Sequence, residues 1–265
     1  TQQKANQNNL LEKVFKLSEH GTNVKTEIIA GITTFMTMAY ILAVNSNMLA
    51  EAGMDAGAVF VATALSATIS CFVMAFLSNY PIALAPGMGL NAFFAYTVVL
   101  QMGYTWQMAL LGVFIEGVLF IILTVTSLRE QIINCIPKDL KNAVTAGVGL
   151  FIASVGMTNA GIINTANGTL ALSSLHDPLV VLSVVGLVIA GILVCRNVRG
   201  ALLLSILLTS AIGMLTGIVT LPTKIVSLNV PSLAPTFMQA FSVPLEKIFS
   251  LDMVIVVFTL SLIHI

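Results

Sequence analysis

One carboxylate lies well inside an apolar segment of the sequence, Glu116 in the stretch VFIEGVLF. An ionised, unpaired carboxylate in hydrocarbon carries a large free-energy cost, so we expect Glu116 to be protonated, hydrogen-bonded or paired. Such an acid is either a proton-relay group or a structural hydrogen-bond partner, and the sequence leaves both roles open. Asp252 lies at the boundary of an apolar segment, where a charge needs no special explanation.

Asn91, in the stretch GMGLNAFF, is the second group that could take part in chemistry. Its side chain offers two hydrogen-bond donors and one acceptor without a charge, which suits the edge of a neutral heterocycle better than a metal ion. The alternative is that Asn91 caps a helix or bridges two helices. Phe93 and Phe94 could stack on a flat ring, although packing is the more common role of aromatic residues in a membrane core.

Four hydroxyl-bearing side chains lie on or beside one helical face of an earlier apolar segment: Thr33, Thr34, Thr37 and Tyr40. Such a stripe either joins helices or lines a cavity, and the pattern by itself favours joining helices. Asn45, farther along the same segment, is likewise expected to bridge helices. The apolar segments contain no nucleophile–base pair and no HExxH-type spacing, so we predict neither an enzyme nor a metal or cofactor site.

Asn91 belongs to an interrupted apolar segment, residues 80–96, with the sequence YPIALAPGMGLNAFFAY. Pro86 has no N–H and disfavours the helical conformation at the residue before it, so residues 82–86 should be extended and a helix should restart at about Gly87 or Met88. Five extended and ten helical residues together cover about 30 Å, the thickness of a hydrocarbon core. Broken spans of this kind are typical of the binding sites of transporters, because the freed backbone groups must line a cavity or be buried in protein.

The composition indicates a polytopic membrane protein. Hydrophobic residues make up 57% of the 265 residues and charged residues 8%, and the mean hydropathy is +1.00. The formal net charge is zero, which argues against a nucleic-acid partner. Three cysteines lie in or beside apolar segments without CxxC spacing, and we expect them to be small buried hydrophobic residues: Cys71, Cys135 and Cys195.

Eight apolar runs follow one another along the chain, of which we expect seven to span the membrane and the last to be an incomplete span. They cover residues 28–49, 59–77, 82–99, 108–128, 143–157, 179–195, 201–219 and 253–265. With a cytoplasmic N-terminus, nine of the eleven basic residues lie on the inside, in agreement with the positive-inside rule. This agreement requires the broken third run to cross the membrane.

Shorter features complete the plan of the chain. In residues 1–26 an apolar helical face indicates either a helix in the membrane interface or a frayed soluble helix; its members are Leu10, Leu11, Val14, Phe15 and Ser18. Two small-residue faces should let helices approach closely, one formed by Ser205, Thr209, Gly213 and Gly217 and the other by Thr145, Gly149 and Ala153. Residues 221–247 are too polar to span. The last six residues, LSLIHI, are expected to be foreign, from read-through of a sequencing adaptor.

Four stretches of this sequence resemble the bacterial and fungal hypoxanthine/guanine/adenine permeases, the purine branch of the nucleobase-ascorbate transporter superfamily. These are TEIIAGITTFMTMAYILAVN (residues 26–45), APGMGLNAFFAY (85–96), TWQMALLGVFIEG (105–117) and IPKDLKNAVTAGVGLFIA (136–153). The second is specific to that branch. The similarity extends over residues 15–259, and one departure is Ser46, where the family usually has proline.

The resemblance implies a fourteen-span fold of two inverted seven-span repeats, in which a core domain (spans one to four and eight to eleven) moves against a gate domain. This chain would then contain a cytoplasmic tail (1–26), one half of the core (27–128), one half of the gate (129–220), an outer loop (221–248) and the start of span eight (249–265). Asn91 matches the purine-binding asparagine of the family. The coupling acids of spans eight and ten would follow residue 265.

We therefore expect an all-helical transporter in the plasma (inner) membrane that imports purine nucleobases with protons, hypoxanthine or guanine before adenine. Its partners would be purine, proton and membrane lipid, with a homodimer left open. The predicted substrate-binding residues are Gly87, Met88, Gly89, Asn91, Phe93, Thr34 and Thr37, and Glu116 is the candidate for proton coupling. The alternatives are an anion transporter of the sulfate/bicarbonate type with the same fold and a membrane-embedded enzyme or assembly protein.

Overall fold

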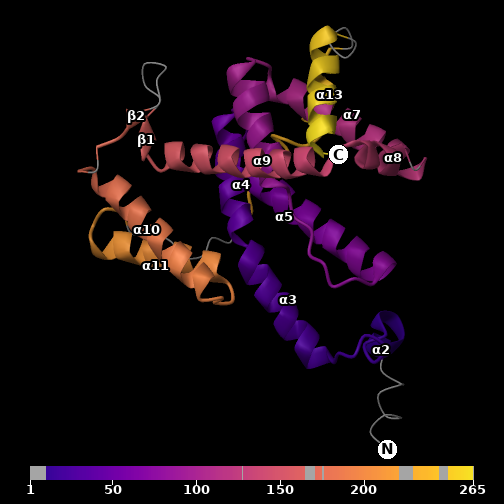
Figure 1. Cartoon of the computed structure of the whole chain (residues 1–265), viewed down its shortest axis with the longest axis horizontal. Helices are drawn as coiled ribbons and strands as arrows, with labels where there is room; N and C mark the ends of the chain where they lie inside the picture. The colour runs from indigo at the N-terminus through magenta and orange to yellow at the C-terminus, as the bar shows by residue number, and fades with distance from the viewer. Residues whose placement is uncertain are drawn as a thin grey trace, which may run out of the picture. The chain divides into compact units, whose positions relative to one another are not determined.

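The computed structural model describes residues 10–126, 128–164, 171–174, 176–220, 229–244 and 250–264, and this part of the chain is mainly helical (Figure 1). The α-helices are α2 Leu10–Phe15, α3 Val24–Met38, α4 Tyr40–Glu51, α5 Ala56–Val73, α6 Met88–Ala92, α7 Trp106–Val125, α8 Leu128–Cys135, α9 Lys138–Asn159, α10 Pro178–Cys195, α11 Ala201–Leu215 and α13 Leu251–His264. Shorter elements are the π-helices η1 Met74–Ser78 and η2 Phe93–Gln101, the 3₁₀-helix η4 Gln239–Ser242 and the antiparallel strands β1 Ile163–Asn164 and β2 Ala171–Leu172.

Each predicted apolar run contains a helical segment, which confirms the all-helical membrane class. Among the described residues, five segments are long and apolar enough to cross a membrane: Val24–Glu51, Ala56–Ser78, Trp106–Val125, Lys138–Asn159 and Pro178–Cys195. Shorter apolar helices in the same part of the chain are Met88–Gln101, Ala201–Leu215 and Leu251–Ser261. The seventh run ends earlier than predicted, at Leu215, because Gly217 follows with a φ of +73° that no right-handed helix contains.

Side chains that cap the helices explain where several of them begin. The Thr105 hydroxyl accepts a hydrogen bond from the Met108 N–H at 3.4 Å at the start of α7. Asp177 accepts one from the Leu179 N–H at 2.9 Å, and proline occupies the first position of α10. Both arrangements satisfy backbone donors that lack a partner within the helix, so the local sequence determines these two starting points.

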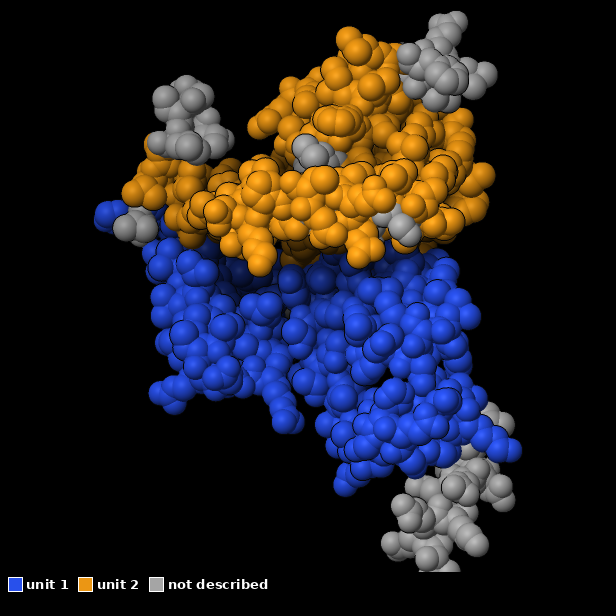
Figure 2. All heavy atoms as spheres, turned by 45° about the vertical axis from the view of Figure 1, so that its right-hand side comes forward, with its two compact units in different colours: residues 1–43, 63–86, 174–226 blue, residues 44–62, 87–173, 227–265 orange. Residues whose placement is uncertain are grey.

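The chain divides into two compact units, which Figure 2 colours separately. The first comprises residues 1–43, 63–86 and 174–226, and the second comprises residues 44–62, 87–173 and 227–265. The division passes through the broken third segment, between Pro86 and Gly87. The functional division into halves of a core and a gate stays a prediction.

In the first unit, α10 and α11 pack closely through small residues. A Cβ added to Gly186 would lie 2.8 Å from Thr209 Cγ2, and one added to Gly213 would lie 2.7 Å from Leu182 Cδ2. These pairs show that the two helices run antiparallel. The predicted small-residue face of the seventh run is therefore confirmed for Ser205, Thr209 and Gly213, whereas Gly217 lies beyond the helix.

In the second unit, an apolar core forms around α7, α13, η2 and the end of α4. Its fully buried members include Val98, Ala109 and Val256. Close packing of α7 on α13 depends on Gly112, where an added Cβ would lie 2.9 Å from Val256 Cγ1. The element η4, from the predicted outer loop, packs against α7, and the Phe114 and Phe241 rings meet edge to face at 5.1 Å.

Two packing predictions are wrong. The face of α9 formed by Thr145, Gly149 and Ala153 is exposed, because α9 contacts α6 through Val148 on another side. The cysteines are not uniformly buried: Cys71 is half-buried, while Cys135 and Cys195 are exposed at helix ends. Apolar composition alone did not indicate which side of these helices has a neighbour within the chain.

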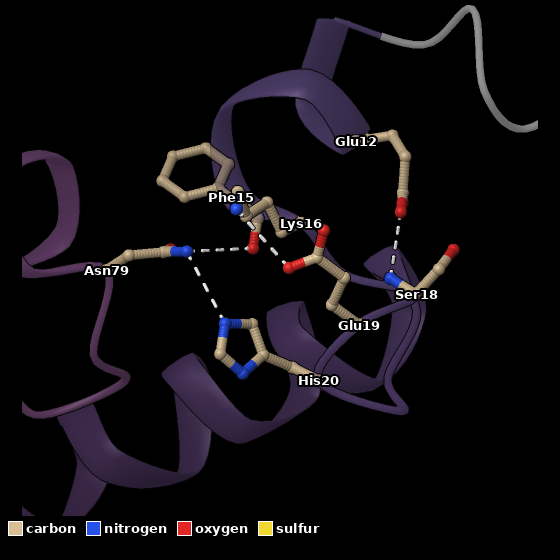
Figure 3. A network of polar contacts seen from close by, with 7 residues as sticks. All are labelled: Glu12, Phe15, Lys16, Ser18, Glu19, His20 and Asn79. Carbon is tan, nitrogen blue, oxygen red and sulfur yellow. Dashed lines mark hydrogen bonds and ion pairs between the residues drawn. The ribbon is translucent and has the colours of Figure 1, made fainter.

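The N-terminal segment folds back onto the end of the second apolar helix (Figure 3). The helix predicted through Ser18 ends at Phe15, because Lys16 adopts a left-handed conformation with a φ of +51°. The Phe15 ring lies 5.6 Å from the Phe76 ring, and the Asn79 amide donates to the Phe15 carbonyl at 3.2 Å. The same amide approaches His20 Nε2 at 3.4 Å. The segment is therefore docked on η1 and the residue that follows it.

Candidate functional site

The interruption predicted around Pro86 is present. Residues 79–87 have no regular secondary structure, and Gly87 is extended, with φ −76° and ψ 117°. A helix starts at Met88, and its first hydrogen bond runs from the Asn91 N–H to the Gly87 carbonyl at 3.2 Å. The first N–H groups of any helix have no partner within it, so the start of α6 presents donors and the positive end of the helix dipole.

The extended arm before the break has a side-chain partner that the sequence interpretation missed. The Leu84 N–H donates to Cys71 Sγ at 3.2 Å, and the Cys71 thiol approaches the Leu84 carbonyl oxygen at 3.4 Å. A non-helical residue in an apolar environment needs such partners for its backbone groups. The one hint of this contact in the sequence was Cys71 itself, a polarisable residue near the end of α5 and shortly before the break.

Asn91 bridges to Asn45, its counterpart on α4. Asn91 Nδ2 donates to Asn45 Oδ1 at 2.6 Å. Asn45 is only 3% exposed, and the adjacent residues Met48 and Ala92 belong to the apolar core of the second unit. The prediction that Asn45 bridges helices is confirmed. For Asn91, the bridging alternative is what the structure shows, and binding of a heterocycle stays a prediction.

α6 and η2 together form a half-helix, Met88–Gln101, that begins at the break. The other predicted residues at its start, near Asn91, divide into open and packed positions. Gly87 is exposed, and a Cβ added there would meet no atom within 4 Å. Gly89 is closed by α9, since an added Cβ would lie 2.8 Å from Val148 Cγ1. Met88 and Phe93 are partly buried against the apolar core. The open side of this half-helix therefore lies at its beginning.

The half-helix continues as a π-helix, η2, in which the Met102 N–H bonds to the Thr97 carbonyl five residues earlier at 2.9 Å. π-Helices are rare, and most are single-turn bulges within α-helices that often lie at functional sites. Nothing in the sequence pattern predicted this one. Its Tyr96 hydroxyl accepts a hydrogen bond from Asn159 Nδ2 at 2.9 Å, and the same amide donates to Glu51 Oε1 at 3.3 Å. Asn159 thus joins the ends of α4 and α9 to η2.

Three hydroxyls of the stripe on the first apolar segment donate hydrogen bonds within their own helix. Thr33, Thr34 and Thr37 each donate to the carbonyl four residues earlier in α3, at 2.8, 2.9 and 2.8 Å. Thr37 is exposed and Thr34 is half-buried. These hydrogen bonds of the three threonines stay within α3, so both roles of the stripe, joining helices and lining a cavity, stay predictions. These residues belong to the first unit, whereas Asn91 belongs to the second.

Glu116 lies in the interior of α7 and is 3% exposed. It follows Gly112 by one helical turn, so it shares the face that packs closely on α13. This position confirms that the carboxylate lies within an apolar helix. Whether Glu116 relays protons or forms a structural hydrogen bond stays open.

Comparison with known proteins identifies the relatives of this chain. The model of the Permease family matches residues 25–265. The guanine/hypoxanthine permease PbuG of Bacillus subtilis is 46% identical over 259 residues, covering 94% of this chain and 58% of PbuG. The guanine/hypoxanthine permease PbuO of the same bacterium is 47% identical, covering 77% of this chain and 48% of PbuO. The adenine permease AdeP of Escherichia coli is 45% identical, covering 78% and 47%.

The chain spans about half the length of the curated relatives it matches. Its apolar helices and these similarities identify a multi-pass membrane protein. The family match extends from the start of the first apolar segment to the last residue and includes the broken segment with Asn91. The chain belongs to the permease family.

Proposed function

We propose that this chain forms part of a secondary active transporter that imports purine nucleobases by proton symport, with guanine or hypoxanthine preferred to adenine. The observation that carries the proposal is the 46% identity with a guanine/hypoxanthine permease over 94% of the chain. A match of that coverage includes the half-helix Met88–Gln101 and the break before it. A broken span near the membrane midplane is where such transporters bind their substrates.

The chemistry of the half-helix suits a neutral purine. The N–H groups at the start of α6 would meet a carbonyl oxygen or ring nitrogen, and Asn91 would read an edge on which a donor lies next to an acceptor. Gly87 leaves room for close approach, since an added Cβ there would meet nothing within 4 Å. In this proposal Phe93 stacks on the ring, and Thr34 and Thr37 line the cavity.

Glu116 is the residue of this chain that we assign to proton coupling. It is 3% exposed inside an apolar helix. An acid in such a place can exchange its proton when its surroundings change, which is the property a symporter needs. Two further acids, from spans eight and ten of the family, would complete the coupling machinery.

The proposed arrangement places the protein in the inner membrane with its N-terminus in the cytoplasm. Seven spans, the third of them broken, and the beginning of an eighth would form the first of two inverted repeats. Transport would follow from movement of a core domain against a gate domain. The charge distribution of the loops supports the orientation, because nine of the eleven basic residues then face the cytoplasm.

Uptake measurements test the function. Cells that lack their own purine permeases should gain saturable uptake of labelled hypoxanthine when they express the full-length gene product, and excess guanine should compete while sulfate should not. Competition by sulfate alone would favour the anion transporter of the same fold. In the same cells, Asn91→Ala should strongly weaken hypoxanthine uptake while the amount of protein in the membrane stays unchanged. Unchanged uptake kinetics would remove Asn91 from the site.

A further inference from the structure

The hydrogen bond between Asn91 and Asn45 determines which groups of the Asn91 amide remain for a ligand. An asparagine side chain has two N–H donors and one carbonyl acceptor. One N–H is engaged by Asn45 Oδ1 at 2.6 Å. The second N–H and the carbonyl oxygen remain, a donor beside an acceptor. This pair can form two hydrogen bonds with a heterocycle edge on which an N–H lies next to a carbonyl or a ring nitrogen.

Asn45 is placed to hold that amide firmly. It is 3% exposed on α4, and its neighbours Ser46 and Met48 are also buried, at 5% and 6%. A hydrogen bond shielded from water and anchored in a packed core restricts rotation of the partner amide, because no water molecule can readily replace the bond. Without it, the Asn91 amide could turn and exchange its donor and acceptor positions.

We propose that Asn45 is a positioning residue of the purine site, whose buried carbonyl oxygen fixes the orientation of the Asn91 amide. The inference rests on the proposed function, in which Asn91 contacts the purine. It adds a residue on the first apolar segment that shapes affinity without touching the substrate. The bond also couples α4 to the half-helix, so both elements contribute to the geometry that the purine meets.

Uptake kinetics in the full-length gene product test this role. Asn45→Ala should raise the KM for hypoxanthine roughly three- to tenfold, the range that corresponds to one net hydrogen bond, while Vmax per transporter in the membrane changes little. Asn45→Asp keeps an acceptor oxygen in the same place and should restore the KM to within about twofold. The matched control is Asn47→Ala, which removes the same side chain from an exposed position of the same helix and should leave the KM unchanged.

The outcomes separate this proposal from the function on which it rests. An unchanged KM in Asn45→Ala, together with weakened uptake in Asn91→Ala, would show that Asn45 is only a helix bridge. The same conclusion would follow if Asn45→Ala lowered the amount of protein in the membrane, Asn45→Asp restored that amount, and the KM stayed unchanged in both variants. If Asn45→Ala does not accumulate, Asn45→Leu, of similar size and suited to an apolar helix, takes its place. If Asn91→Ala also leaves uptake unchanged, the purine site itself is wrong.

Discussion

Replacing Gly186 by alanine should force α10 and α11 apart. An added Cβ would lie 2.8 Å from both Thr209 Cγ2 and Thr209 Oγ1 and 3.4 Å from its Cβ. Carbon atoms pack best at about 3.5–4.0 Å, so relief requires a shift of about 1 Å. Rotating the Thr209 side chain about χ1 would relieve little of this contact, because two of the three staggered positions on its Cβ carry a heavy atom. Rotation would also break the hydrogen bond from its hydroxyl to the Ser205 carbonyl at 2.7 Å.

The expected magnitude follows from comparison with a second glycine of the same helix. Gly191 has no atom within 4 Å of an added Cβ. Both substitutions gain the same helix propensity, up to about 1 kcal/mol, so the difference between them isolates the packing term. Overpacking of this kind costs about 1–3 kcal/mol. For a chain of this size that difference lowers the midpoint of thermal unfolding by roughly 2–12 °C.

Thermal unfolding of the detergent-solubilised variants measures the effect. Gly186→Ala should unfold at a lower temperature than the unchanged protein, and Gly191→Ala at the same or a higher one. Adding Thr209→Ala to Gly186→Ala should restore much of the loss, since it removes the two atoms that lie 2.8 Å from the new methyl group. Equal midpoints for the two glycine variants would refute the close approach of α10 and α11 at this point.

Three further perturbations probe polar contacts outside the helix pair. Asn79→Gly allows the left-handed backbone at this position, with its φ of +53°, but removes the hydrogen bond to the Phe15 carbonyl. Tryptic cleavage of the N-terminal segment should then become roughly fivefold faster. An unchanged cleavage rate would exclude docking through this amide. Asp252 raises the pKa of Tyr104 above 10.0 chiefly by accepting its hydrogen bond, with smaller contributions from desolvation and the negative charge. This interaction stabilises the folded protein fully below the ordinary tyrosine pKa, and the stabilisation is lost as the pH rises through the raised pKa of Tyr104. Asp252→Asn should lower the pKa of Tyr104, which ultraviolet difference absorbance measures. Asn159→Ala removes two hydrogen bonds and should destabilise the protein by about 1 kcal/mol in thermal unfolding.

Local physics explains what the sequence determined by itself. A high mean hydropathy and apolar runs of about twenty residues predict a membrane protein without reference to any contact, and the helical segments follow those runs. The break before Met88 was equally predictable, because the missing N–H of Pro86 acts on its immediate neighbours. Glycine and small-residue spacing also predicted the close packing of α11.

Tertiary structure decided everything that depends on segments distant in sequence. The partner of Asn91 is 46 residues away, and no local rule selects Asn45 over a ligand or another helix. Small residues on α9 and α11 look alike in sequence, yet within the described residues those of α11 have a helix against them while the predicted face of α9 is exposed, since packing depends on which face a neighbour reaches. Cys71 became the partner of Leu84 because the chain folds back after the second apolar helix. Composition and proline chemistry therefore established the class of protein and the broken helix, and long-range packing determined how the Asn91 amide is held.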